Sequence, residues 1–277
     1  DCAVVVVALH KMTEEKISQM PESVKCISRL GVGLDSIDLV AANKFKLPVI
    51  FQPTYAYNEV ANHAAAMALA LHRGIYQATT TTQDGKWIPA TQIAEITSLQ
   101  DSTLGVIGCG RIGQTFIKKM QPFVKDIIGF DPAVTQTIPG VTMTKNLDEL
   151  LTKCKVISMH APYMPSTHHM IGKRELALMQ KGSILVNVSR GGLIDEAALM
   201  EALESGHLDG AGLDVFEKEP LAEDAPIRKT KNLLLSPHIA WYSKSSGPRL
   251  VEWGLMDAVN FITKQTISNG KFAAGPF

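Results

Sequence analysis

The stretch "TLGVIGCGRIGQ", from Thr103 to Gln114, places three glycines within six residues: Gly108, Gly110 and Gly113. The apolar run "LGVI" directly before the first glycine is typical of a strand, and a helical pattern begins at the last one. Glycine permits a tight turn there, and its missing side chain lets the backbone approach a pyrophosphate at the helix N-terminus. Because the glycine spacing alone is common, the prediction depends on this flanking strand and helix.

The next apolar strand, "DIIGFDP", ends at Asp131, which lies 18 residues after Gly113. In a dinucleotide-binding turn, an acidic residue about 20 residues on accepts hydrogen bonds from the adenosine ribose and repels a 2′-phosphate. The sequence therefore predicts a dinucleotide site that prefers NAD to NADP.

Composition bounds the class of protein. The chain has 277 residues, of which 45% are hydrophobic and 19% charged, as in a two-domain protein with a sizeable core. Basic and acidic residues are equal at 27 each, so we expect no nucleic-acid partner. No apolar run reaches the roughly 18 residues that a membrane span needs, so we expect no membrane partner. The four cysteines form no CxxC pair, which favours reduced thiols in a cytoplasmic protein.

Strands and helices alternate along the chain, which predicts an α/β fold with parallel sheets. From residue 103 onward, six apolar strands alternate with helices, as in a Rossmann-type doubly wound parallel sheet. An alanine-rich segment over residues 57–83 predicts one long helix before this sheet, and a final helix over residues 249–264 would return the chain to the first unit. We therefore predict a smaller, discontinuous domain of residues 1–56 and 246–277 and an NAD-binding domain of residues 57–245.

Three side chains that could carry out chemistry follow strands on the same side as the glycine turn: Arg190, Glu219 and His238. An arginine can hold a carboxylate and a carbonyl oxygen together with its planar fork. A histidine donates a proton near neutral pH, and a neighbouring glutamate favours its imidazolium form. Taken singly, each has an ordinary interpretation as a surface charge, a solvated glutamate or a structural cap. Together they predict hydride transfer between a nicotinamide cofactor and a 2-keto acid.

Five blocks of the chain resemble, in this order, those of the NAD-dependent D-2-hydroxyacid dehydrogenases: "GVGLDSID", "TLGVIGCGRIG", "VNVSRGGLIDE", "LDVFEKEP" and "SPHIAW". The resemblance covers nearly the whole chain. It implies that Arg190, Glu219 and His238 are the catalytic residues, and that the smaller domain is a flavodoxin-like α/β substrate domain. Because this family has a further strand and helix before the strand at Cys2–Leu9, we expect an N-terminal segment to be missing from that domain.

The same resemblance implies ligand contacts. The loop formed by Leu30, Gly31, Val32 and Gly33 matches the one that receives the substrate carboxylate. Trp241 would lie at the substrate pocket together with Arg190 and His238, although it could equally be an ordinary buried tryptophan. The positions expected to contact the cofactor are Gly108, Gly110, Arg111, Ile112, Gly113, Asp131, Ala161, Pro162, Val188, Ser189 and Asp214.

Two branches of the family share further blocks with the chain. "PHIAW" is similar to glycerate dehydrogenases (hydroxypyruvate reductases), whereas "VALH", "HHMI" and "AWYS" resemble the C-terminal-binding proteins, which are NAD(H)-binding corepressors on the same fold. The favoured function is reversible, NADH-dependent reduction of a small 2-keto acid, such as hydroxypyruvate or glyoxylate, to the D-2-hydroxy acid. The alternative is an NADH-sensing, corepressor-like scaffold, which the lack of basic runs and low-complexity tails disfavours. The resemblance also implies a homodimer.

The remaining histidines and threonines have structural interpretations. His168 and His169 lack partners at metal-ligand spacing and are expected at the surface, so no metal site is predicted. His63, Met67 and Leu71 recur at intervals of four and predict a packing stripe along the long helix. The β-branched run Thr79–Thr82 is expected to fray that helix at its end.

Overall fold

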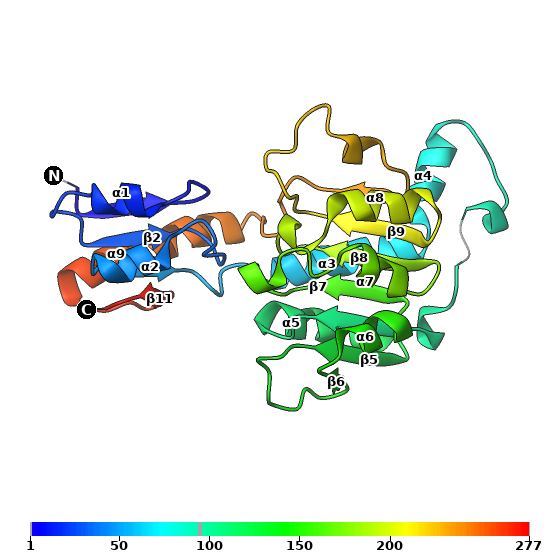
Figure 1. Cartoon of the computed structure of the whole chain (residues 1–277), viewed down its shortest axis with the longest axis horizontal. Coiled ribbons are helices and arrows are strands. Elements are labelled where there is room, and N and C mark those ends of the chain that lie inside the picture. The colour runs from blue at the N-terminus through cyan, green and yellow to red at the C-terminus, as the bar shows by residue number, and fades with distance from the viewer. Residues whose placement is uncertain (1, 94–95, 277) are drawn as a thin grey trace. The chain divides into compact units, whose positions relative to one another are not determined.

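The chain divides into two compact units in a computed structural model that describes residues 2–93 and 96–276 (Figure 1). The smaller unit comprises Asp1–Tyr57 and Trp241–Phe277, and the larger unit comprises Asn58–Ala240. The chain therefore passes between the units twice, and residues 241–245 belong to the smaller one.

A seven-stranded sheet forms the centre of the larger unit, with the strand order β10-β9-β8-β7-β4-β5-β6 and every pair parallel. The strands are β4 (Thr103–Ile107), β5 (Asp126–Phe130), β6 (Thr142–Thr144), β7 (Val156–Met159), β8 (Ser183–Asn187), β9 (Leu208–Leu213) and β10 (Leu233–Leu235). The chain runs outward from β4 to β6 and then returns to β7, so the strand order reverses between β4 and β7. The predicted doubly wound parallel sheet is confirmed, and the short edge strand β6 is one that the sequence pattern does not predict.

Helices cover both faces of this sheet. They are α3 (Tyr57–His72), α5 (Arg111–Met120), α6 (Leu147–Lys153), α7 (Lys173–Leu178) and α8 (Glu196–Glu204), whereas the further helix α4 (Ile75–Gln83) buries none of its side chains. One hydrophobic cluster joins the sheet to Leu150 of α6 and Leu199 of α8, and the other joins it to Met67 of α3 and Phe116 of α5. Burial on two faces explains why the strands are almost continuously apolar. Over the part of the chain that the structure describes, every helix is too short or too polar to cross a membrane.

The segment over residues 57–83 forms two helices, so the prediction of a single long helix is wrong. Gly74 adopts the left-handed conformation, with φ of 61°, and separates α3 from α4. The expected fraying at Thr79–Thr82 is also wrong, because α4 continues to Gln83. The hydroxyls of Thr80 and Thr81 donate to carbonyl oxygens four residues earlier, at 3.0 and 2.7 Å, so these side chains are accommodated within the helix.

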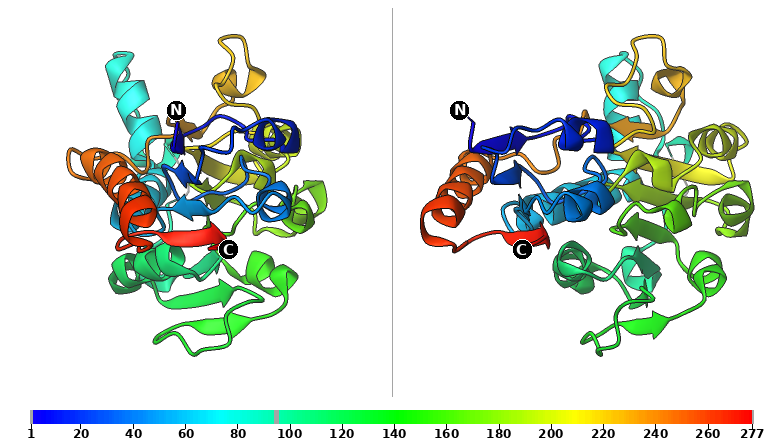
Figure 2. Two further views of the ribbon diagram at one scale, coloured as in Figure 1. Left: turned by 90° about the vertical axis from the view of Figure 1, so that its left-hand side faces the viewer. Right: turned by 60° about the vertical axis from the view of Figure 1, so that its left-hand side comes forward.

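The smaller unit contains a four-stranded mixed sheet in the order β1-β2-β3-β11. Its elements are β1 (Val4–Val7), α1 (Glu14–Ser18), β2 (Cys26–Arg29), α2 (Leu39–Lys44), β3 (Val49–Phe51), α9 (Ser246–Lys264) and β11 (Lys271–Ala274). The first three strands are parallel, and β11, red in Figure 2, pairs antiparallel with β3. The predicted second, smaller α/β domain is thus confirmed, with one strand, β11, that the sequence pattern does not predict.

A buried carboxylate explains how the tail reaches this sheet. Asp257 of α9 has no exposed surface and accepts hydrogen bonds from the backbone N–H groups of Ser268 at 2.7 Å and Gly270 at 2.6 Å. It also accepts a hydrogen bond from the Gln52 side chain at 3.2 Å, next to the end of β3. One side chain therefore fixes the turn between α9 and β11, a long-range constraint that a local pattern does not contain.

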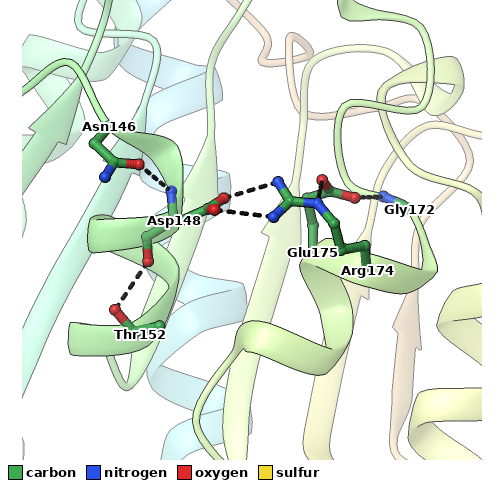
Figure 3. A network of polar contacts seen from close by, with 6 residues as sticks. All are labelled: Asn146, Asp148, Thr152, Gly172, Arg174 and Glu175. Atoms are coloured by element: carbon green, nitrogen blue, oxygen red, sulfur yellow. Dashed lines mark hydrogen bonds and ion pairs between the residues drawn. The ribbon is translucent and has the colours of Figure 1, made fainter.

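An exposed polar network joins α6 to α7 on the surface of the larger unit (Figure 3). The Arg174 guanidinium donates to both carboxylate oxygens of Asp148, at 2.8 and 2.9 Å, and to Glu175 at 2.9 Å. The hydrogen bonds from Arg174 hold the pKa of Asp148 below its usual value. Because solvent screens exposed ion pairs, this network orients the two helices more than it stabilises the fold.

Candidate active site

The glycine turn links β4 to α5 through close backbone contacts. Gly108 has φ of 90°, and its N–H donates to the carbonyl oxygen of Phe130 at 2.8 Å. A Cβ atom on Gly108 would strike the backbone of His160 and Ala161 after β7, and one on Gly113 would strike the carbonyl oxygen of Gly108. Both positions therefore require glycine for packing, at the point where the strand order reverses.

Gly110 differs from its two neighbours in the motif. Its φ of −73° and ψ of −162° are open to any residue, and a Cβ atom there would meet nothing within 4 Å. Packing and conformation thus give no reason for a glycine at this position. Open space at the residue preceding α5, whose first N–H groups have no partner within the helix, is what a pyrophosphate requires. The turn fits a dinucleotide.

Asp131 lies at the end of β5 and faces this turn. Its Oδ2 atom accepts a hydrogen bond from the Cys109 N–H at 2.8 Å, and its Oδ1 atom accepts one from the Ala133 N–H at 2.9 Å. These contacts fix the carboxylate in place. Since each carboxylate oxygen can accept a second hydrogen bond, the fixed group can also receive a ribose hydroxyl.

The other predicted cofactor positions lie along the same edge of the sheet. Ser189 follows β8, and its hydroxyl donates to the Met159 carbonyl oxygen at the end of β7, at 3.0 Å. This contact ties together two strand ends that carry predicted cofactor positions. The full set comprises the turn and first helical residues after β4 (Gly108, Gly110, Arg111, Ile112, Gly113), Asp131 after β5, Ala161 and Pro162 after β7, Val188 and Ser189 after β8, and Asp214 after β9.

His238 and Glu219 form a short hydrogen bond. The His238 Nδ1 atom lies 2.6 Å from Glu219 Oε2, and about a third of each side chain is exposed (32% and 31%). The other oxygen, Oε1, accepts a hydrogen bond from the Phe216 N–H at 2.9 Å. Burial would raise the pKa of Glu219, but the hydrogen bonds from His238 and Phe216 and the charges of His238 and Arg190 outweigh burial and lower it. Glu219 is thus a carboxylate that accepts the Nδ1 proton of His238.

The backbone at His238 is held by Asp214. His238 has φ of 56°, which is uncommon for a residue other than glycine, and its N–H donates to the Asp214 carbonyl oxygen at 2.8 Å. The buried Asp214 carboxylate accepts the N–H groups of Ile239 and Ala240, at 2.9 and 2.8 Å. Asp214 therefore supports the turn that carries the histidine, a role that its resemblance-based assignment as a cofactor contact does not include.

Arg190 is brought toward Glu219 by another close backbone contact. The Asn187 side chain donates to the Arg190 carbonyl oxygen at 2.8 Å and fixes the backbone after β8. A Cβ atom on the following residue, Gly191, would strike the backbone of Phe216. The glycine therefore lets the Arg190 loop pack on the segment that positions Glu219, and the charge of Arg190 acts on that carboxylate.

A second polar cluster braces the same segment. Glu196 and Glu217 exchange hydrogen bonds, each N–H donating to the other's carboxylate, at 3.1 and 2.6 Å. Burial raises the pKa of Glu196. His169, with φ of 48°, places its Nε2 atom 3.0 Å from Glu217 and stacks on the exposed His168. The surface prediction thus holds for His168, whereas His169 is half-buried and has a partner that its local sequence does not reveal.

In the smaller unit, the predicted carboxylate-receiving loop is shaped by a buried arginine. Arg29 is 7% exposed, and its side chain folds back to donate to the carbonyl oxygens of Leu30 and, at 3.0 Å, Gly33. Gly31 has φ of 143°. Leu30 belongs to the same apolar cluster as Trp241, whose ring lies 6.2 Å from that of Tyr55. The structure therefore brings together two of the predicted substrate contacts, Leu30 and Trp241, within this unit.

Comparison with known proteins gives the family. Residues 65–240 match the family model described as "D-isomer specific 2-hydroxyacid dehydrogenase, NAD binding domain". The chain belongs to the D-isomer-specific 2-hydroxyacid dehydrogenase family. The matched range contains every predicted cofactor position as well as Arg190, Glu219 and His238. This match confirms the resemblance seen in the sequence and the expectation of NAD as the cofactor, both at the level of the family.

Individual relatives within the family differ in their names. A D-3-phosphoglycerate dehydrogenase of Methanocaldococcus jannaschii is 39% identical over 241 residues, which cover 86% of this chain and 45% of that protein. A glycerate dehydrogenase of Methylorubrum extorquens is 34% identical, covering 85% of this chain and 74% of that one. The crystal structure of a D-lactate dehydrogenase from Aquifex aeolicus complexed with NAD and lactic acid has a TM-score of 0.89 at 32% identity, covering 99% and 87% of the two chains. The chain spans about half the length of the phosphoglycerate dehydrogenases that it matches.

The open space at Gly110 leads to a prediction about cofactor binding in this dehydrogenase-family chain. In G110A, the added methyl group meets no protein atom, so we expect the melting temperature to fall by no more than a few degrees, the cost of alanine at the N-cap of α5. The same methyl group would occupy the space that the cofactor's pyrophosphate needs, so the Kd for NADH should rise about tenfold or more. Fluorescence titration and thermal unfolding measure the two effects.

G113A is the matched comparison, because its Cβ atom would strike the Gly108 carbonyl oxygen and should lower the melting temperature as well. An unchanged Kd for NADH in G110A would contradict the assignment of the glycine turn as the pyrophosphate site.

Proposed function

We propose that this chain is an NAD(H)-dependent D-2-hydroxyacid dehydrogenase that reversibly reduces a small 2-keto acid. The observation that carries the proposal is the 2.6 Å pair between His238 and Glu219, which lies in the unit that contains the dinucleotide turn. A histidine with a charged carboxylate on Nδ1 is an arrangement suited to donating and recovering a proton. We also propose that the larger unit is the cofactor domain and the smaller unit the substrate domain.

Each residue of the proposed site has a separate task. The Arg190 guanidinium would hold the substrate carboxylate and polarise the neighbouring carbonyl group. His238 would donate its proton to the carbonyl oxygen during reduction and take it back during oxidation, while Glu219 stabilises the imidazolium form. Bound NADH supplies the hydride for reduction. The glycine turn would hold the pyrophosphate, and Asp131 the adenosine ribose.

We propose that the substrate is small, of the hydroxypyruvate or glyoxylate type. Support comes from the apolar cluster of Leu30, Tyr55 and Trp241, which places aromatic surface beside the predicted carboxylate loop. Relatives named glycerate dehydrogenase and glyoxylate reductase, 34% and 32% identical, agree with such a substrate. Because other relatives are named D-3-phosphoglycerate dehydrogenase, the 2-keto acid of 3-phosphoglycerate is the competing substrate to test.

The first experiment measures NADH oxidation at 340 nm with hydroxypyruvate, glyoxylate, pyruvate, a branched-chain keto acid and the keto acid of 3-phosphoglycerate. We expect rapid turnover of one small acid, with NADH preferred to NADPH. In R190A, kcat/KM should fall about 10²–10³-fold, the loss typical of removing one group that stabilises developing charge. The Kd for NADH should stay within about twofold, because Arg190 is assigned to the substrate.

R174A is the matched control, since Arg174 is an arginine of the same unit held in an exposed network between helices (Figure 3). It should keep the wild-type kcat/KM. Tight NADH binding with slow turnover of every acid would contradict the enzyme proposal, and the NADH-sensing, corepressor-like scaffold would then be favoured.

A second prediction concerns the pH dependence of reduction. Because the pKa of Glu219 is lowered, its carboxylate remains charged around neutral pH. E219Q removes this charge and leaves His238 without the carboxylate that accepts its Nδ1 proton, so kcat/KM for reduction should fall in E219Q at neutral pH. The difference between E219Q and the wild type should shrink as the pH falls and the Glu219 carboxylate of the wild type takes up a proton. A kcat/KM of E219Q equal to that of the wild type at neutral pH would contradict the proposed pairing.

We further propose that the protein is cytoplasmic and forms a homodimer through the region of α3 and α4. None of the side chains of α4 is buried, and Ile75 is 53% exposed. Trp87, shortly after α4, is 93% exposed, and association would remove this apolar surface from water. Light scattering during gel filtration should give twice the chain mass for the wild type and a lower mass for W87E. A monomeric wild type would contradict the homodimer.

A further inference from the structure

His63 of α3 is hydrogen-bonded to the loop that leads to the proposed catalytic histidine. Its Nε2 atom lies 2.9 Å from the Ser236 hydroxyl oxygen and 3.7 Å from Asp214 Oδ1. The predicted packing stripe is correct for Met67 and Leu71, which are 4% and 3% exposed. It is wrong for His63, whose side chain is 25% exposed and forms a polar contact instead.

The direction of these hydrogen bonds follows from the donors available. Both oxygens of Asp214 accept backbone N–H groups, those of Ile239 and Ala240, which can only donate. The Ser236 hydroxyl has one proton and donates it to Asp214 Oδ1 at 2.5 Å. Its oxygen then accepts a hydrogen bond from His63, so the Nε2 atom of His63 carries a proton. Two consecutive hydrogen bonds therefore run from His63 through Ser236 to Asp214.

These hydrogen bonds lead to the turn that carries His238. Asp214 binds three consecutive backbone N–H groups: its carbonyl oxygen accepts that of His238 at 2.8 Å, and its carboxylate accepts those of Ile239 and Ala240. With φ of 56°, His238 keeps an unfavourable conformation only because its surroundings fix it. Anything that orients the Asp214 carboxylate therefore orients the His238 ring toward Glu219.

We propose that His63 is a positioning residue for His238, acting through Ser236 and Asp214. The inference rests on the proposed function, in which His238 transfers the proton. The His63 Nε2 atom lies 3.7 Å from the buried Asp214 carboxylate and 2.9 Å from the Ser236 hydroxyl oxygen. Its N–H fixes the Ser236 hydroxyl, and the fixed hydroxyl directs one Asp214 oxygen while leaving the other for Ala240. Without the donor, Ser236 can rotate and the carboxylate is no longer held in one orientation.

The variants separate the hydrogen bond from simple packing. H63L removes the donor and keeps an apolar side chain of similar reach, whereas H63Q retains an N–H donor on its amide. S236A removes the hydroxyl group that links His63 to Asp214. H207L is the matched control, because His207 lies in the same unit and its Nε2 atom also forms a polar contact, with the Leu176 carbonyl oxygen at 3.0 Å. His207 directly precedes β9, whereas Asp214, Ser236 and His238 all follow that strand.

The first readout does not depend on activity. The ring-nitrogen NMR signals of His238, assigned by comparison with H238Q, report the Nδ1 hydrogen bond to Glu219 in the cofactor-free full chain. We expect these signals to shift or broaden in H63L and S236A, to recover largely in H63Q and to stay unchanged in H207L. Wild-type signals in H63L would overturn the proposal, and so would H63Q signals no closer to the wild type than those of H63L.

The second readout compares the effect of each variant on kcat with its effect on the Kd for NADH. With the 2-keto acid that the wild type reduces, kcat should fall about 10- to 100-fold in H63L and S236A, the loss expected from a misplaced catalytic group. The Kd for NADH should stay within about threefold, and the double variant should be no slower than either single one. A kcat in H63L within twofold of the wild type would overturn the proposal, as would additive losses in the double variant.

The two proposals fail in different ways. If the wild type reduces none of the acids, the proposed function fails, while the NMR comparison still decides whether His63 positions His238. If the wild type is active and H63L has the same kcat and the same His238 signals, only the proposed role of His63 fails. Should H63L not fold, as judged by circular dichroism and thermal unfolding, S236A and H63Q give the same decision.

Discussion

The larger unit depends on one close approach of two backbones, that of Gly108 against His160 and Ala161. The turn after β4 and the residues after β7 can touch only because Gly108 has no Cβ atom, and this contact lies where the strand order reverses. The parallel register then carries the ends of β5, β8 and β9 to the same edge. Every polar side chain assigned to the cofactor in the sequence is thereby placed along one line. A larger residue at position 108 would separate the two loops and with them the two halves of the sheet.

A similar contact shapes the end of the sheet that carries the proposed catalytic residues. Gly191 lets the Arg190 loop lie against the backbone of Phe216, and the Phe216 N–H donates to Glu219. Glu219 in turn pairs with His238. Arginine, glutamate and histidine arise from three different strand ends, yet backbone packing rather than side-chain length brings them together. This explains why glycine follows Arg190 in the chain, just as glycine occurs in the dinucleotide turn.

Much of this arrangement could be predicted from the sequence, because strands buried on both faces give uninterrupted apolar runs and because glycine has few other uses at strand ends. The elements that could not be predicted depend on distant partners. Strand β11 is positioned by the Asp257 carboxylate, and the long helix is broken by a single left-handed residue, Gly74. His63 follows the helical spacing of a packing stripe, and its actual partner, Ser236, lies 173 residues away along the chain. No local pattern distinguishes such a histidine from its apolar neighbours.

The position of Asp214 connects the two proposed halves of the chemistry. Its carboxylate is buried and accepts the backbone N–H groups that follow His238, while the family resemblance assigns the same residue to the cofactor site. A change in the orientation of this carboxylate therefore alters the placement of the proposed proton donor. A residue that orients Asp214 without touching substrate or cofactor can therefore change the position of His238 and, with it, the rate of proton transfer. His63 lies on a helix remote in sequence from every proposed catalytic residue, and its contacts with Ser236 and Asp214 give it that influence.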